Sequence, residues 1–156
     1  MQTAQLGSLD LREIGHEYLS QIYILDKQID QDLIQLKQLR RKAQAIGAVD
    51  YSRIIVKSSP ENTMECIMES IEAQHSRINE HIQALAEQKK EAIDLIDQIE
   101  RPIDRTILHY RYICLCRMDD IATRVGYDKR HVIRLCNRGL REIGEKVVTQ
   151  CHIKRC

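Results

Sequence analysis

The stretch DDIATRVGYDKRHVIRL, residues 119–135, places a glycine between two segments whose apolar residues recur at helical spacing. We predict that Gly126 ends a short helix of residues 118–125, since glycine adopts the left-handed conformation of a helix stop without steric cost. Asp128 is a good N-cap for a second helix, which we expect over residues 129–146. The stretch therefore predicts a helix, a turn of a few residues and a second helix.

The apolar residues around this turn have the spacing that the core of a helix-turn-helix requires. Ala122 lies four residues before Gly126, so its small side chain can occupy the point where the two helices cross. Larger apolar residues are expected to surround it, namely Ile121, Val125, Tyr127, Val132 and Leu135. The turn and this core together favour a helix-turn-helix far more strongly than a basic helix alone would.

The second helix of the motif has one apolar face and one basic face. At 100° per residue, the apolar side is formed by Val132, Leu135, Cys136, Gly139, Leu140 and Ile143. The other side is polar. Arginine on this side can bind guanine or phosphate, and asparagine can bind adenine. A lysine at the start of the helix can bind phosphate. We therefore predict DNA contacts from Lys129, Arg130, Arg134, Asn137, Arg138 and Arg141.

A solvated basic face is the alternative interpretation of the same residues. Arg138 and Glu142, and Arg141 and Glu145, have the i,i+4 spacing of helical ion pairs. The charge distribution favours DNA: residues 1–100 carry 11 Lys and Arg against 17 Asp and Glu, whereas residues 101–156 carry 13 against 6. The basic final third on an acidic body indicates that one end of the chain binds a polyanion.

Residues 1–100 contain two segments with a heptad pattern. In the first, seven of the eight positions 22, 25, 29, 32, 36, 39, 43 and 46 are apolar, with Asp32 as the exception and Gly47 as a plausible stop. In the second, nine of the eleven positions 64, 68, 71, 75, 78, 82, 85, 89, 92, 96 and 99 are apolar, with His75 and Lys89 as exceptions. Asn62 or Thr63 is the expected cap of the second segment.

Two helices of similar length with one apolar seam each predict an antiparallel hairpin. Two long helices bury little apolar area alone, so we expect a homodimer. Pro102 marks a boundary, because proline disfavours helix for the preceding residue and is tolerated in the first turn of a helix. The predicted fold is all-α, with a helical hairpin or coiled coil at 1–100, serving dimerisation, and a helix-turn-helix domain at 101–156.

Several classes of protein are disfavoured by the sequence. It has neither an apolar stretch of transmembrane length nor the pattern of a secretory signal, so we expect a cytoplasmic protein without membrane contact. It has no glycine-rich phosphate loop, nucleophile elbow or paired catalytic carboxylates, so we expect no enzyme, no catalytic residue and no cofactor. The candidate ligands of a zinc site would be Cys114, Cys116, His131, Cys136, Cys151, His152 and Cys156. Their spacing disfavours such a site, and we expect the cysteines to be free thiols.

The stretch RTILHYRYICLCRMDDIATRVGYDKRHVIRLCNRGLREI, residues 105–143, resembles the C-terminal domain of bacterial sigma factors, which reads the upstream promoter element. Residues 15–145 are also similar to small phage-encoded proteins of Gram-positive bacteria, and late-transcription regulators of the ArpU and RinA type have a close architecture. The resemblance implies a sequence-specific transcriptional regulator of a phage or prophage that acts at promoters. It gives the DNA-contact role to Lys129, Arg130, Arg134, Asn137 and Arg138.

The sequence departs from a full sigma factor in one respect. The promoter-melting domain of sigma factors uses aromatic side chains that stack on flipped bases, whereas this chain has no Phe or Trp. We therefore expect an accessory factor or activator, with double-stranded DNA as its partner and RNA polymerase as a further candidate. Two alternatives stay open: a DNA-packaging component similar to a small terminase subunit, and an adaptor that binds other proteins through the hairpin.

Overall fold

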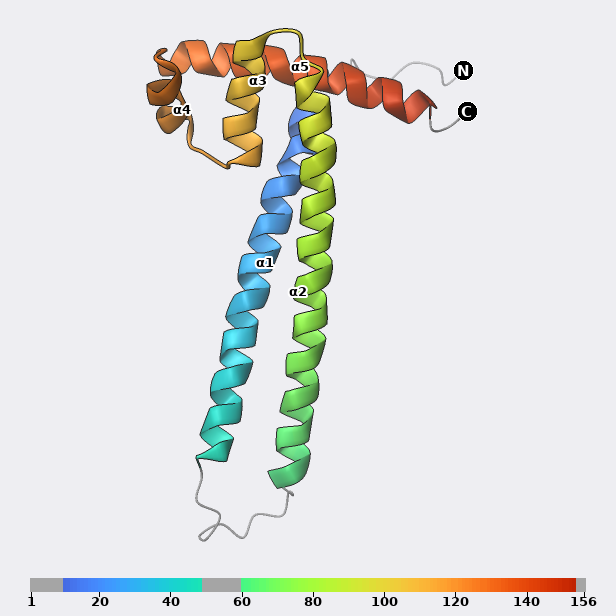
Figure 1. Ribbon diagram of the computed structural model, residues 1–156, viewed down its shortest axis with the longest axis vertical. Helices are drawn as coiled ribbons and strands as arrows, with labels where there is room; N and C mark the ends of the chain where they lie inside the picture. Colours follow the sequence, from blue (N-terminus) through green and yellow to red (C-terminus); the bar gives the residue numbers. More distant parts are fainter. Residues whose placement is uncertain (1–9, 49–59, 154–156) are drawn as a thin grey trace, which may run out of the picture. The chain divides into compact units, whose positions relative to one another are not determined.

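The chain is all-α, with a long antiparallel hairpin followed by shorter helices (Figure 1). The computed structural model describes residues 10–48 and 60–153, and no strand occurs within those ranges. The helices are α1 (Leu11–Gly47), α2 (Pro60–Asp97), α3 (Pro102–Leu108), the π-helical turn η2 (His109–Ile113), α4 (Met118–Val125) and α5 (Lys129–Ile153). The predicted fold class is confirmed.

Backbone contacts divide the chain into two compact units. Residues 25–85, on both sides of the connection between α1 and α2, form what we call the hairpin unit. The described residues 10–24 and 86–153 form the composite unit, which contains the other ends of α1 and α2 together with all later helices. The junction near residue 101, as a division between dimerisation and DNA binding, stays a prediction.

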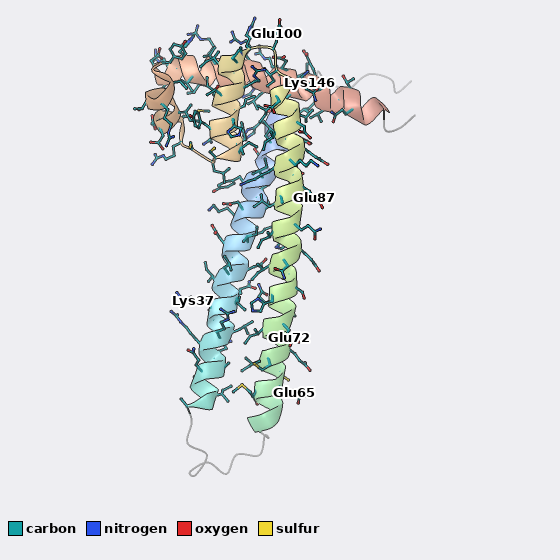
Figure 2. The ribbon with its side chains drawn as sticks, in the orientation of Figure 1. Lys37, Glu65, Glu72, Glu87, Glu100 and Lys146 are labelled. Atoms are coloured by element: carbon teal, nitrogen blue, oxygen red, sulfur yellow. The ribbon has the colours of Figure 1, made fainter. Side chains whose placement is uncertain are left out.

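The predicted seam of α1 is confirmed. All eight seam positions are buried or half-buried, and Ile22 and Leu36 are 0% and 5% exposed. Polar residues occupy the other faces, as an amphipathic helix requires. Figure 2 shows the labelled side chains of Lys37, Glu65 and Glu72 extending outward from the two helices, and all three residues are exposed.

The predicted seam of α2 is confirmed at eight of its eleven positions. Positions 64, 71, 78, 85, 89, 92, 96 and 99 are buried or half-buried, as expected. Met68, His75 and Ile82 are instead exposed, and the helix also turns residues 67, 74, 81 and 88 inward. The apolar count missed Gln74 and His81, whose side chains in the seam contact Asp32.

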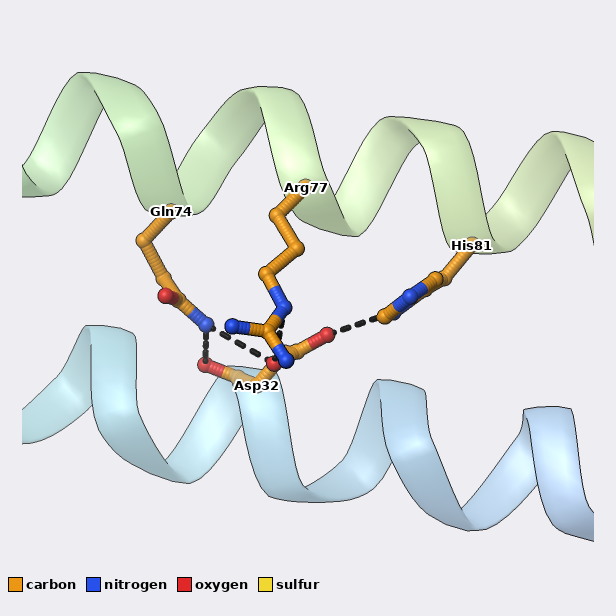
Figure 3. A network of polar contacts seen from close by, with 4 residues as sticks. All are labelled: Asp32, Gln74, Arg77 and His81. Atoms are coloured by element: carbon orange, nitrogen blue, oxygen red, sulfur yellow. Dashed lines mark hydrogen bonds and ion pairs between the residues drawn. The ribbon is translucent and has the colours of Figure 1, made fainter.

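A polar network surrounds Asp32, the one polar residue in the α1 seam (Figure 3). Its carboxylate is 4% exposed and lies 2.7 Å from His81 Nδ1 and 3.4 Å from Arg77 Nε. Gln74 Nε2 donates to both Asp32 Oδ1 and the Asp32 carbonyl oxygen, at 3.0 and 3.1 Å. Together these donors satisfy a carboxylate that would be costly to bury without partners.

The helix boundaries confirm some sequence signals and correct others. Gly47 ends α1 as predicted. Pro102 opens α3 after an extended Arg101 with φ −89° and ψ 119°, which confirms the predicted break. The cap predicted at Asn62 or Thr63 is wrong, because α2 already begins at Pro60, whose fixed φ suits a first helical turn.

Within the composite unit, α1 and α5 cross at two glycines. A Cβ atom on Gly15 would overlap the carbonyl oxygen of Leu140, and one on Gly144 would overlap the carbonyl oxygen of Leu11. Only glycine permits such a close approach of two helix backbones. This crossing anchors the start of α1 against the middle of α5.

Candidate nucleic-acid interface

The turn between α4 and α5 has the conformation that the sequence predicts. Gly126 follows Val125 with φ 73° and ψ 27°, and its N–H donates to the Ala122 carbonyl oxygen at 3.0 Å. The N–H of Tyr127 donates to the same oxygen at 3.2 Å. Since a Cβ on Gly126 would meet no atom, the positive φ alone explains the glycine.

Asp128 caps α5 as predicted, because its Oδ1 accepts a hydrogen bond from the N–H of His131 at 3.0 Å. The helix begins at Lys129 but extends to Ile153, beyond the end expected near Lys146. No proline or glycine interrupts residues 147–153, and Val147 and Val148 are half-buried. Their partial burial favours continuation of the helix.

The predicted core of the helix-turn-helix forms with one exception. Ile121, Ala122, Val132 and Leu135 are buried, and Val125 is half-buried. Tyr127 instead is 46% exposed, and its ring meets the His131 ring edge to face at 5.0 Å. Tyr127 lies in the turn and is exposed, so its assignment to the core was wrong.

The polar face of α5 surrounds a hollow of about 400 Å³, and no acidic residue lines it. Arg130, Arg134 and Arg141 are exposed, and Asn137 is half-buried. Arg134 Nη2 lies 3.2 Å from His131 Nδ1. The residues around the hollow are His131, Arg134, Leu135, Asn137, Arg138 and Arg141. Four of the six predicted contact residues therefore lie together, with a histidine that the sequence analysis did not consider for DNA contact.

Lys129 has an ion-pair partner within the motif. Its Nζ lies 2.9 Å from Asp119 Oδ1, and this contact lowers the pKa of the Asp119 carboxyl group below its usual value. The pair joins the first turn of α4 to the first turn of α5. Lys129 is 54% exposed, so it remains within reach of a solvent-side phosphate.

Arg138 is held by a buried carboxylate that the sequence analysis overlooked. Its Nε and Nη2 donate to Asp104 Oδ2 and Oδ1, at 2.7 and 2.8 Å, and this bidentate contact raises the pKa of the guanidinium group. Asp104 is fully buried on α3. The sequence did carry an indication of this contact. Asp104 lies on the same helix face as Ile107 and Leu108, and a lone acidic residue on an apolar face needs a cationic partner. The role of Arg138 in DNA contact stays a prediction, beside this structural role.

The i,i+4 pairs of the alternative interpretation do not form among the described residues. Glu142 Oε1 instead accepts a hydrogen bond from the backbone N–H of Glu100 at 3.3 Å. Arg141 and Glu145 are both exposed and form no ion pair with one another. Glu142 lies near enough to Arg138 to contribute to the raised pKa of its guanidinium group, but it forms no ion pair with that group.

Among the described residues, the cysteines are free thiols and no group of three or more metal-binding side chains gathers. Cys136 is buried, which confirms its expected place in the core, and burial raises the pKa of its thiol to about 11. Cys151, His152 and Cys156 lie outside the described side chains.

Comparison with known proteins adds no family: the chain matches no protein-family model, no curated protein and no solved structure. Within residues 10–48 and 60–153, none of the helices has an apolar stretch long enough to span a membrane.

Proposed function

We propose that this protein is a sequence-specific DNA-binding transcriptional regulator, of the phage or prophage kind that the sigma-like resemblance implies. One observation carries the proposal: the polar face of α5 gathers Arg134, Asn137, Arg138 and Arg141 around one hollow that no Asp or Glu lines. A basic helix face that follows a helix-turn-helix turn suits the major groove of DNA.

The side chains divide into roles by their position and their partners. Arg134 and Arg141 are exposed and can reach guanine edges or phosphates, and Asn137 between them can bind adenine. Arg130 and Lys129 lie in the first turn of α5 and are assigned to phosphate. Arg138 is assigned first to orienting α5 through Asp104 and only second to DNA.

DNA binding is tested by selecting bound duplexes from a random pool and measuring affinity for the enriched motif at several salt concentrations. Arg134→Ala with Arg141→Ala removes two cations, and we expect weaker binding and a salt slope that is smaller in magnitude by roughly 2. Lys37→Ala with Arg41→Ala is the matched control, because it removes the same charge from exposed positions of α1. Unchanged affinity of the first variant, or an equal loss in the control, would refute the proposal.

Homodimerisation through the hairpin unit is the second part of the proposal. Leu33, Met68 and Ile82 each follow a seam residue and are 48%, 50% and 49% exposed. The equivalent positions Arg40 and His75 are in contact at 3.2 Å, so this flank of the hairpin is continuous across both helices. A second copy would cover the apolar side chains and give a bundle of four helices.

The oligomeric state separates the regulator from its alternatives. Light scattering of the intact chain is expected to give a dimer, and Leu33→Glu with Ile82→Glu is expected to give a folded monomer. A dimer would place two α5 helices on half-sites about one DNA turn, or a multiple of it, apart. A large closed ring would instead favour the packaging component, and failure to bind any duplex at low salt would favour the adaptor.

A further inference from the structure

The composite unit contains a second cavity, of about 420 Å³, that is separate from the basic face of α5. It lies where the start of α1 meets η2 and the segment leading to α4. Side chains of all three segments line it: His16, Ser20 and Tyr23 from α1, Arg111 and Tyr112 from η2, and Leu115 and Arg117 from the segment after it. Its size falls within the range of small-molecule sites.

Two arginines and three residues with hydroxyl groups are among those that line this cavity, and no Asp or Glu lines it. Arg111 is oriented by donating from Nη1 to the Cys116 carbonyl oxygen at 3.1 Å, and its other N–H groups bind none of the described residues. Arg117 is exposed, and its side chain forms no hydrogen bond or ion pair within the described part of the chain. Two guanidinium groups thus line the same cavity, and each has N–H groups that bind none of the described residues.

A hydrogen-bonded chain of three side chains forms another wall. His16 Nδ1 and the Tyr112 hydroxyl are 2.7 Å apart, and His16 Nε2 is 3.5 Å from Ser20 Oγ. Burial is the main reason that the pKa of Tyr112 is raised, so this phenol stays protonated and retains its donor. Ser20, and Tyr112 when His16 Nδ1 carries the proton of their contact, can donate to an anion in addition to the arginines.

The backbone next to the cavity departs from regular helix at two points. Residues 109–113 form a π-helical turn, in which the Cys114 N–H donates to the His109 carbonyl oxygen at 3.0 Å. Leu115 then adopts a positive φ of 56°, which is costly for a residue with a branched side chain. In an unbroken α-helix, residues six apart would point about 120° away from one another. The break lets Arg111 and Arg117 line one cavity, and such departures are frequent at functional sites.

We propose that this cavity binds a small phosphomonoester, with the phosphate held by Arg111 and Arg117 and its organic part against Leu115. A phosphate dianion matches two guanidinium groups better than a single carboxylate does, because each planar fork can donate two hydrogen bonds to it. The inference goes beyond DNA binding and does not depend on it, since none of these residues belongs to the polar face of α5.

The test uses the full chain, with inorganic phosphate and AMP as probes. Each is titrated into labelled protein while amide resonances are followed by NMR and the melting temperature is recorded. We expect saturable shifts at residues 16–20 and 111–117, a higher melting temperature, and displacement of phosphate by AMP. Arg117→Gln should weaken the binding of both probes by at least about tenfold, because it removes one of two charged donors. Arg41→Gln, at an exposed position of α1 away from both sites, should leave their binding unchanged.

Two results would overturn the proposal. One is the absence of saturation by either probe up to tens of millimolar, or an equal loss in Arg117→Gln and Arg41→Gln, which would indicate general attraction of anions. The other is a pattern in which neither probe binds, duplex DNA shifts the same resonances, and Arg117→Gln lowers the affinity for DNA. The guanidinium groups would then bind the phosphates of the DNA backbone. Arg111→Gln gives a second variant, whose fold is checked by its unbound spectrum.

Discussion

The ion pair between Asp104 and Arg138 predicts that removing one partner lowers the stability of the fold more than removing the other. The Asp104 side chain is fully buried, whereas the Arg138 side chain is 40% exposed. Arg138→Ala therefore leaves a carboxylate enclosed in the protein without its cation. Asp104→Ala leaves a guanidinium group that can turn its N–H groups toward water.

The expected magnitudes follow from this difference in exposure. Loss of the partner of a buried charge costs about 3–5 kcal/mol, which we expect for Arg138→Ala. Loss of the bidentate contact when the remaining group can be hydrated costs about 1–2 kcal/mol, which we expect for Asp104→Ala. The double variant Asp104→Ala with Arg138→Ala should be less destabilised than Arg138→Ala alone, since no charge then stays buried.

Urea unfolding followed by far-ultraviolet circular dichroism measures all three variants against the parent chain. The reasoning is refuted if Arg138→Ala costs less than about 1 kcal/mol, or if Asp104→Ala is the more destabilising of the two single variants. The result also decides how DNA binding is tested. A loss of DNA affinity in an Arg138 variant would combine unfolding with a lost contact, so Arg134 and Arg141 are the better positions to change.

Three further predictions concern packing and burial. Gly144→Ala should destabilise the chain by at least about 2 kcal/mol in thermal unfolding, because its methyl group would overlap the Leu11 carbonyl oxygen; a neutral effect would contradict the close crossing. Asp32→Ala should cost roughly 2–3 kcal/mol in the same assay, since it removes a carboxylate that three side chains of α2 contact, and Asp32→Asn should cost less. Cys136 should react with a disulfide reagent far more slowly than exposed Cys66 until the chain unfolds, because burial raises its pKa from 9.0 to about 11. The same shift means that its stabilising contribution is complete below pH 9.0 and is lost as the pH rises through about 11, which a pH series of unfolding midpoints would detect.

The sequence alone determined the features that depend on local chemistry. Gly126, Asp128 and Pro102 each set the backbone through properties of a single residue: positive φ, a capping carboxylate and a fixed φ. The seam of α1 was equally predictable, because its apolar residues recur at heptad spacing with Asp32 as the single exception. These local features of the sequence together predicted the hairpin, the turn after α4 and the basic face of α5.

Only the tertiary structure decided which polar residues are buried and which partners they contact. Asp32 draws Gln74 and His81 into the seam of α2, so hydrogen bonding overrode the apolar count there. Asp104 engages Arg138 from 34 residues away. The cavity beside Arg111 and Arg117 likewise requires α1 to meet a segment far along the chain. Periodicity ranks residues by hydrophobicity, but a buried polar group is stabilised by a partner whose position only the folded chain fixes.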